Sequence, residues 1–263
     1  MKRITQVFEK AKKENRIALI GYLPAGYPDA SSFLKLAECA FEAGLDFLEI
    51  GLPSFNPYFD GVIIRRAIEQ SIQRGTNVAT ALKQTQQLLH SLQRTATLIF
   101  YPDVLNQISY SALLAQCVDA QVAGILAVGA PLPEWLKMAN AAKQRDIAPI
   151  GFLSASMEGW ALKQVLTAAE GFLYLQSRDA PTGSPGEFGD QIARRIETIR
   201  KSGPKILPVA VGFGVRRSQD VEQVRRMGAD GVIVGTAFVE AAEQGCAALQ
   251  DLVYSLSQAA VFS

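Results

Sequence analysis

Two carboxylates stand in or just after a short apolar segment of the sequence. Glu49 lies near the end of the run 46–51, and Asp60 follows eleven residues later in the segment 56–61. The run is short, apolar and bounded by glycines, which predicts a buried β-strand. An ionised glutamate in such a strand is costly unless it is paired or has a chemical role. We therefore interpret Glu49 as a proton-transfer residue, with a salt-bridged or solvent-facing glutamate at a strand end as the alternative.

Short apolar runs recur along the chain with helical segments between them. The eight runs cover residues 17–22, 46–51, 97–101, 124–128, 148–153, 171–176, 206–211 and 231–234. Eight strands with crossover helices predict an α/β fold, a parallel (β/α)8 TIM barrel, with an additional N-terminal helix and a C-terminal helix from about Ala237. A doubly wound open sheet is the alternative, because periodicity does not prove closure. In a barrel, Glu49 and Asp60 fall on the face of the βα loops, where active sites lie.

Composition and length limit the classes of function. No linker interrupts the alternation, so we expect residues 1–263 to form a single domain. The formal charge of +1 gives no electrostatic reason to expect nucleic acid or an anionic membrane as a partner. No apolar run approaches the roughly 20 residues that cross a bilayer, and the N-terminus lacks a signal-peptide pattern. These features favour a cytoplasmic protein.

The cysteines and the histidine argue against several kinds of site. Cys39, Cys117 and Cys246 lie far apart, and His90 is the only histidine. The odd cysteine number and the lack of a Cys-x-x-Cys pair argue against a disulfide framework and a zinc site. A Ser-His-Asp triad and a multi-histidine metal site would each depend on His90. We therefore expect no metal and a reducing compartment.

Glycine-rich segments follow the last two predicted strands. Residues 212–214 follow the seventh, while Gly235 and Thr236 follow the eighth and open a helix. Glycine allows backbone N–H groups to approach an anion, and a helix N-terminus adds a favourable dipole. The loops after strands seven and eight are a frequent phosphate site in such barrels. These segments therefore predict a phosphate site, and residues 180–184 are a third candidate.

Several motifs together resemble the tryptophan synthase alpha subunit family over nearly the whole chain. They lie at residues 21–28, 48–61, 177–183, 211–214 and 228–237. The resemblance implies a TIM barrel without a cofactor of its own. It also implies a carbon–carbon lyase of tryptophan biosynthesis that cleaves indole-3-glycerol phosphate to indole and glyceraldehyde 3-phosphate. The family passes indole through a tunnel to a pyridoxal-phosphate β subunit, so an α2β2 complex is implied as well.

The resemblance also implies roles for individual residues. Glu49 would be the general acid/base that delivers and removes protons, and Asp60 would bind the indole N–H and stabilise positive charge on the ring. The substrate would be bound by Tyr22, Ile64, Tyr101, Leu126, Tyr174, Thr182 and Phe213. The phosphate would be bound by Gly183, Gly214, Gly235 and Thr236. For the aromatic and aliphatic residues, filling of the barrel core is the alternative interpretation.

Several loop residues depart from the family pattern. Asn56 replaces an aspartate that helps to couple the loop to the β subunit, which implies a weakened contact. Tyr58 and Phe59 bring bulk where smaller residues are common. Asp103 replaces an asparagine after the third strand, and Ala130 replaces an aspartate after the fourth. The resemblance therefore implies altered ordering of the loops on the catalytic face.

Three functional interpretations remain open. The chain is an alpha subunit or a close paralogue that works with a β subunit, a stand-alone or specialised-pathway lyase, or a non-catalytic allosteric partner of a β subunit. Retention of both Glu49 and Asp60 favours an enzyme, because a regulatory chain has little physical reason to keep a costly buried glutamate.

Overall fold

One parallel sheet forms the centre of the molecule. The structure is a computed structural model that describes residues 2–154, 156–176, 185–212 and 214–262. Within this part of the chain, the strands are β1 (Ala18–Pro24), β2 (Phe47–Gly51), β3 (Ala96–Phe100), β4 (Gly124–Ala127), β5 (Ala148–Pro149), β6 (Gly151–Leu153), β7 (Leu173–Gln176), β8 (Val209–Gly212) and β9 (Gly231–Val234). Their order is β5-β4-β3-β2-β1-β9-β8-β7-β6.

The sheet closes into a barrel through the fifth predicted run. This run is divided into β5 and β6, which are separated only by Ile150. The Ile150 N–H donates to the carbonyl of Ile125 at 2.8 Å, and the Gly151 N–H donates to the carbonyl of Phe172 at 3.4 Å. The segment thus pairs with the chain at β4 on one side and at β7 on the other. The predicted parallel (β/α)8 barrel is confirmed.

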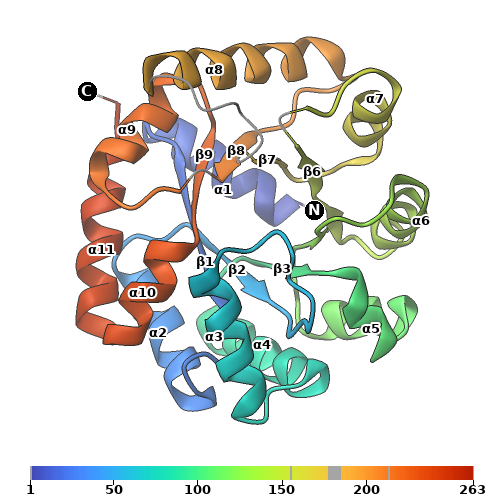
Figure 1. The fold of residues 1–263 in the computed structure, drawn as a ribbon, viewed down its shortest axis with the longest axis vertical. Helices are drawn as coiled ribbons and strands as arrows, with labels where there is room; N and C mark the ends of the chain where they lie inside the picture. Colours follow the sequence, from blue (N-terminus) through green and yellow to red (C-terminus); the bar gives the residue numbers. More distant parts are fainter. Residues whose placement is uncertain (1, 155, 177–184, 213, 263) are drawn as a thin grey trace.

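Helices surround the strands in Figure 1, and α1 crosses the ring in that view. The helices are α1 (Lys2–Lys13), α2 (Ala30–Glu42), α3 (Val62–Gln73), α4 (Val78–Leu92), the 3-10 helix η1 (Pro102–Asn106), α5 (Tyr110–Asp119), α6 (Leu132–Lys143), α7 (Gly159–Ala168), α8 (Pro185–Ser202), α9 (Ser218–Arg226), α10 (Thr236–Gln244) and α11 (Cys246–Ala259). The predicted N-terminal helix is therefore present. The single predicted C-terminal helix is wrong, because Gly245 has φ of +105° and separates α10 from α11.

Local chemistry explains where some elements begin. The Asp29 carboxylate accepts hydrogen bonds from the backbone N–H groups of Ser31 and Ser32, both at 3.0 Å, and so caps the start of α2. The predicted seventh strand started too early. Ile206 is 79% exposed, and β8 begins only after Pro208, which has no N–H to give to a neighbouring strand.

Helix α1 closes the amino-terminal end of the barrel. Ile4 and Phe8 of this helix are buried in one cluster with side chains from inside the barrel. The Phe8 ring lies 6.0 Å from the Phe47 ring and 5.7 Å from the Phe172 ring, measured between centroids. A side chain at Gly231 would approach Phe8 to 2.9 Å, so glycine leaves the space that Phe8 fills. The base of the barrel is thus sealed by apolar packing.

A disulfide corrects the expectation from the cysteine spacing. Cys39 of α2 and Cys246 at the start of α11 are bonded across a sequence separation of 207 residues. Closure of the barrel brings the first and last helices of the ring together, and linear spacing does not reveal such a contact. The expected absence of disulfides is therefore wrong, while Cys117 is a free and buried thiol.

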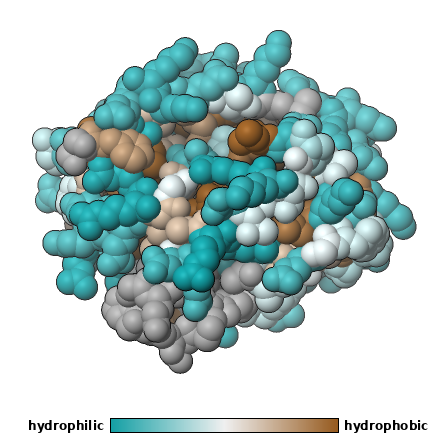
Figure 2. Space-filling view, turned by 90° about the horizontal axis from the view of Figure 1, so that it is seen from above, coloured by the Kyte–Doolittle hydropathy of each residue, from teal (hydrophilic) through white to brown (hydrophobic). Residues whose placement is uncertain are grey.

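Neither a membrane-spanning helix nor a clustered metal site occurs in the described part of the chain. No helix in this part of the chain is both long enough and apolar enough to cross a membrane. No group of three or more His, Cys, Asp or Glu side chains in the same residues could hold a metal ion. The face on the side of α8, seen in Figure 2, is mostly hydrophilic, and apolar side chains reach its surface in small groups.

Candidate active site

A cavity of about 140 Å³ lies at the carboxyl ends of the strands. The described residues that line it are Phe59, Asp60, Ile64, Ile99, Tyr101, Val128, Phe152, Tyr174, Gln176, Gly212, Gly214, Val215, Ile233, Gly235 and Thr236. They come from both ends of the chain, and the barrel brings them together. Seven of the predicted site residues are among them, namely Asp60, Ile64, Tyr101, Tyr174, Gly214, Gly235 and Thr236.

Other predicted site residues lie elsewhere. Glu49, Tyr22 and Leu126 are buried in the barrel and do not line the cavity. Thr182, Gly183 and Phe213 lie outside the described residues. The geometry therefore places one carboxylate of the predicted pair at the cavity and the other below it.

Glu49 points into the barrel, one layer beneath the floor of the cavity. Alternation along β2 puts it on the same side as Phe47, which belongs to the interior cluster. Glu49 is paired with Thr97 on β3, and the next interior residue of β3, Ile99, lines the cavity. Only 1% of Glu49 is exposed, and neither its Oε1 nor the Thr97 Oγ1 has a hydrogen-bond partner.

Burial controls the protonation of Glu49. Removal from water disfavours the charged carboxylate, which raises the pKa of Glu49 to about 8. The carboxyl group is therefore mostly neutral at pH 7 and can donate a proton. Its strand partner Tyr22 is also buried, and burial, followed by the charges of Asp60 and other neighbours including Glu49, raises the pKa of the Tyr22 phenol. Tyr22 thus lies within the electrostatic influence of both carboxyl groups.

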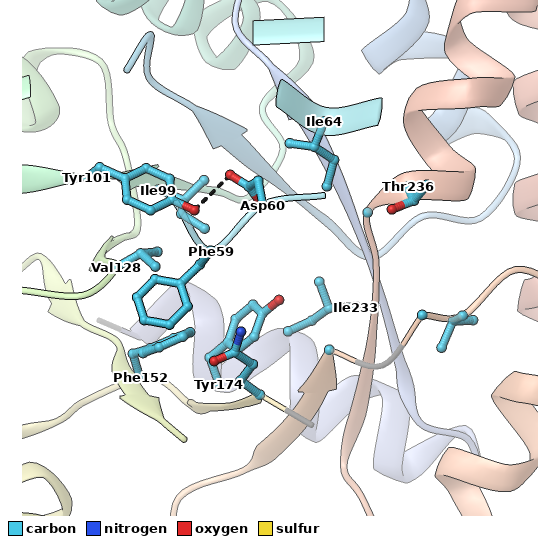
Figure 3. A pocket seen from close by; sticks show the side chains of 15 residues that line it. Phe59, Asp60, Ile64, Ile99, Tyr101, Val128, Phe152, Tyr174, Ile233 and Thr236 are labelled. Carbon is cyan, nitrogen blue, oxygen red and sulfur yellow. Dashed lines mark hydrogen bonds between the residues drawn. The ribbon is translucent and has the colours of Figure 1, made fainter. Parts of the chain in front are cut away.

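Asp60 is held at the cavity by Tyr101, which directly follows β3. The Tyr101 hydroxyl donates a hydrogen bond to Asp60 Oδ2 at 2.8 Å (Figure 3). Burial, and next the charge of Asp60, raise the pKa of Tyr101, so this phenol remains a neutral donor. The bond fixes the orientation of a carboxylate that lines the cavity. Such a carboxylate can accept an N–H or stabilise a nearby positive charge.

Aromatic rings form one wall of the cavity. The Tyr58 ring lies 5.3 Å from Tyr101 and 4.8 Å from Phe59, measured between centroids. Phe59 lies 5.6 Å from Phe152, which in turn lies 5.5 Å from Tyr174. Figure 3 shows Phe59, Phe152 and Tyr174 close together on the side away from Thr236. The wall is suited to a flat aromatic ligand.

The sequence interpretation did not name eight of the lining residues individually as site residues, although it placed Gly212 in the predicted phosphate segment 212–214. The eight are Phe59, Ile99, Val128, Phe152, Gln176, Gly212, Val215 and Ile233. Several occupy interior positions near the carboxyl ends of strands. Once the strand ends are known, the alternation of side chains along each strand identifies such positions. The Gln176 side chain adds a buried Oε1 without a hydrogen-bond partner.

Backbone from the last two loops forms the opposite wall. Gly235 precedes α10, and Thr236 is the first residue of that helix. The first N–H groups of a helix have no partner within it and attract anions. At the end of β8, beside β7, a side chain at Gly212 would come within 2.3 Å of the Tyr174 hydroxyl oxygen. Glycine at 212 therefore leaves the space that Tyr174 occupies.

The loop between β2 and α3, here called loop 2, is anchored by residues that depart from the family pattern. Asp103 accepts hydrogen bonds from the Ser54 hydroxyl and the Phe55 N–H, each at 2.8 Å. The Tyr58 hydroxyl donates to the carbonyl of Gly129 at 3.2 Å. The departures from the family pattern implied altered ordering of this loop. In the structure, Asp103 and Tyr58 supply contacts that order it.

The closed barrel and the cavity at its carboxyl end define an α/β-barrel enzyme. The family model described as tryptophan synthase alpha chain matches residues 8–261. The chain belongs to the tryptophan synthase alpha chain family. Members of this family are lyases that cleave indole-3-glycerol phosphate to indole and glyceraldehyde 3-phosphate.

Individual relatives cover nearly the whole chain. The tryptophan synthase alpha chain of Arabidopsis thaliana is 30% identical over 98% of this chain and 95% of its own length. That of Thiobacillus denitrificans is 32% identical over 92% of this chain and 88% of its own. A solved tryptophan synthase structure from M. tuberculosis has a TM-score of 0.88 and 27% identity, covering 98% of both chains.

Proposed function

We propose that this chain cleaves indole-3-glycerol phosphate with Glu49 as the proton-transfer residue. The observation that carries the proposal is a fully buried glutamate beneath a cavity lined by aromatic rings, with a pKa raised to about 8. A carboxylic acid that stays protonated near pH 7 is suited to general acid catalysis.

The reaction is a retro-aldol cleavage in which Glu49 gives and regains one proton. The Glu49 carboxyl protonates C3 of the indole ring, and the ring carries the resulting positive charge towards its nitrogen. The Glu49 carboxylate then takes the proton of the glycerol hydroxyl next to the ring. The bond between C3 and that carbon breaks, its electrons return to the ring, and the hydroxyl carbon becomes the aldehyde. Indole and glyceraldehyde 3-phosphate leave with Glu49 protonated again.

Asp60 and the glycine-rich wall complete the proposed site. Asp60, oriented by Tyr101, accepts the indole N–H and stabilises the cationic ring. Backbone N–H groups near Gly214, Gly235 and Thr236 bind the phosphate at the start of α10. The remaining proposed substrate contacts are Tyr22, Ile64, Leu126 and Tyr174, together with Thr182, Gly183 and Phe213 outside the described residues.

We propose a tryptophan synthase β subunit as the protein partner. Family membership supports this assignment. Loop 2 and the start of α3 offer apolar surface for such a contact, since 74% of Phe55 in the loop and 72% of Val62 in the helix are exposed. Asn56 lies in the same loop and replaces the coupling aspartate of the family, so we expect a weaker contact than the family average.

A second candidate is a lyase that works without a partner. The observation that favours it is the anchoring of loop 2 within the chain itself, by Asp103 and Tyr58. A loop that is already ordered holds Asp60 at the cavity without help from another subunit.

An assay of indole release separates these alternatives. Purified chain is given indole-3-glycerol phosphate with and without a tryptophan synthase β subunit, and Glu49→Gln is the matched variant. We expect indole from the unmodified chain and at least a 10²-fold lower rate from the variant, the lower range for loss of a proton-transfer group. Strong stimulation by the β subunit supports the first candidate, and a high rate alone supports the second.

Two results would contradict the proposal. Equal activity in Glu49→Gln would exclude its assigned role, and no turnover under either condition would leave a non-catalytic partner as the interpretation.

We propose the cytoplasm as the location, because the family's role in amino-acid biosynthesis supports it. The disulfide between Cys39 and Cys246 argues in the other direction, since disulfides are rare in reducing compartments. Alkylation of thiols at cell lysis, followed by counting in denaturant, tests the point. Three alkylated cysteines indicate a reduced chain, and one indicates the bonded form.

A further inference from the structure

A second cavity of about 220 Å³ lies beside the candidate active site. We call it the side chamber. Its wall includes Leu132 and Trp135 of α6, Met157 before α7 and Val165 within α7. Among the described residues that line it, none carries a charge. The chamber is therefore suited to an apolar molecule rather than to a phosphate.

The side chamber and the catalytic cavity share a wall. Phe59 and Phe152 line both spaces, and their rings meet edge to face with centroids 5.6 Å apart. Phe59 belongs to loop 2, next to Tyr58, whose hydroxyl binds the carbonyl of Gly129. Gly129 itself lines the chamber. The Phe59 and Phe152 rings therefore form part of the wall between the two spaces.

We propose that the side chamber binds a neutral planar aromatic molecule of the size of indole. Trp135, Phe152 and Phe59 supply ring surfaces for stacking. Ser154 also lines the chamber, and its hydroxyl oxygen can accept a ring N–H. Ala130 adds a small uncharged side chain to this wall. The assignment of indole rests on the proposed function, because indole is the product of the proposed reaction in the neighbouring cavity.

Trp135 provides a direct probe of the chamber. The chain has two tryptophans, and they differ in exposure: Trp135 is 6% exposed and Trp160 is 66% exposed. In a Trp160→Phe background, tryptophan fluorescence reports on the chamber alone. The ligand is 5-bromoindole, because its bromine quenches tryptophan emission on contact. We expect saturable quenching in this background and only linear collisional quenching in Trp135→Phe, where exposed Trp160 remains.

Variants that fill the chamber test the location. In the Trp160→Phe background, Ala130→Phe and, separately, Ser154→Phe should abolish saturable quenching, provided that circular dichroism shows a folded protein. Ala112→Phe on the exposed surface of α5 adds the same ring elsewhere and should leave the quenching unchanged. Linear quenching in the Trp160→Phe protein would overturn the proposal, as would saturable quenching that persists in both filled variants.

The chamber and the lyase proposal can fail separately. Adding Glu49→Gln removes the proposed proton transfer but leaves every residue of the chamber in place, so saturable quenching should persist. A chain without lyase activity that still shows this quenching would contradict the proposed function alone. A chain that releases indole but lacks the quenching would contradict the chamber alone.

Discussion

At the scale of single residues, the two carboxyl groups differ in environment and therefore in chemistry. Glu49 is fully buried without a partner for Oε1, and its pKa is raised to about 8. Asp60 lines the cavity and accepts a hydrogen bond from Tyr101. Burial favours the protonated form of Glu49, while the Tyr101 hydroxyl orients the Asp60 side chain at the cavity. This separation suits an acid and a charge-stabilising group in one site.

The raised pKa of Glu49 predicts opposite effects of one substitution on activity and stability. Between pH 4.5 and 8 the folded chain keeps a proton on Glu49 that the unfolded chain has lost, so this group's contribution to the free energy of unfolding decreases as pH rises. Glu49→Gln removes that dependence. We expect the variant to gain stability relative to the unmodified chain from pH 5 to 8, by up to a few kcal/mol, on the order of the linkage limit.

Urea unfolding of both proteins at several pH values measures the effect on stability. Indole release from the unmodified chain at the same pH values measures how activity depends on Glu49. Activity should decline as pH rises through about 8, where the Glu49 acid is lost. A stability difference that does not change with pH would show that Glu49 titrates normally.

At the scale of elements, the backbone conformation of loop 2 determines the position of Asp60. Asp103 in η1 holds Ser54 and Phe55 near the start of the loop, and Tyr101 holds Asp60 near its end. Both anchors belong to the segment that follows β3. Together with the bond from Tyr58 to Gly129 after β4, these contacts position the loop from two neighbouring strand ends, which makes its order a property of this chain.

We expect Asp103→Ala to release the start of loop 2. The substitution removes two hydrogen bonds to a carboxylate, so the position of Asp60 becomes less well defined. The rate constant kcat/KM should decrease about tenfold, equivalent to about 1.4 kcal/mol. Asp251→Ala on the exposed surface of α11 is the control. Unchanged kinetics in Asp103→Ala would show that loop 2 does not depend on this anchor.

At the scale of the whole molecule, the Cys39–Cys246 bond joins α2, which follows the first strand, to α11, which follows the last. It encloses most of the chain in one covalent loop. A crosslink of this kind restricts the unfolded chain more than the folded one. The effect on stability should therefore be seen in unfolding rather than in the geometry of the cavity.

Reduction of the disulfide should lower the free energy of unfolding by about 2–4 kcal/mol, the usual range for such a bond. Urea unfolding with and without dithiothreitol measures the difference. Cys246→Ser is the control, because it lacks the bond and should not respond to the reductant. Equal urea midpoints for the oxidised and reduced unmodified chain would indicate that the bond contributes nothing to stability.

Much of the fold could be predicted from the sequence because apolar runs and glycines mark parallel strands locally. The role of Glu49 was suggested by the same local pattern, and the single-domain organisation of residues 1–263 stays a prediction. The disulfide, the contact between Tyr58 and Gly129, and the place of Phe152 in the wall could not be predicted. Each depends on segments that meet only when the barrel closes, and the spacing of residues along the sequence does not predict which distant segments come into contact.

The seal formed by α1 also has a consequence for the order of events during synthesis. Ile4 and Phe8 leave the ribosome before the strands of the barrel, but the surface that receives them includes Gly124, Gly171 and Gly231. The last of these belongs to β9, which is made more than two hundred residues later. Helix α1 therefore reaches its final contacts only after β9 has been made, and until then its apolar side lacks the surface that buries it in the folded chain.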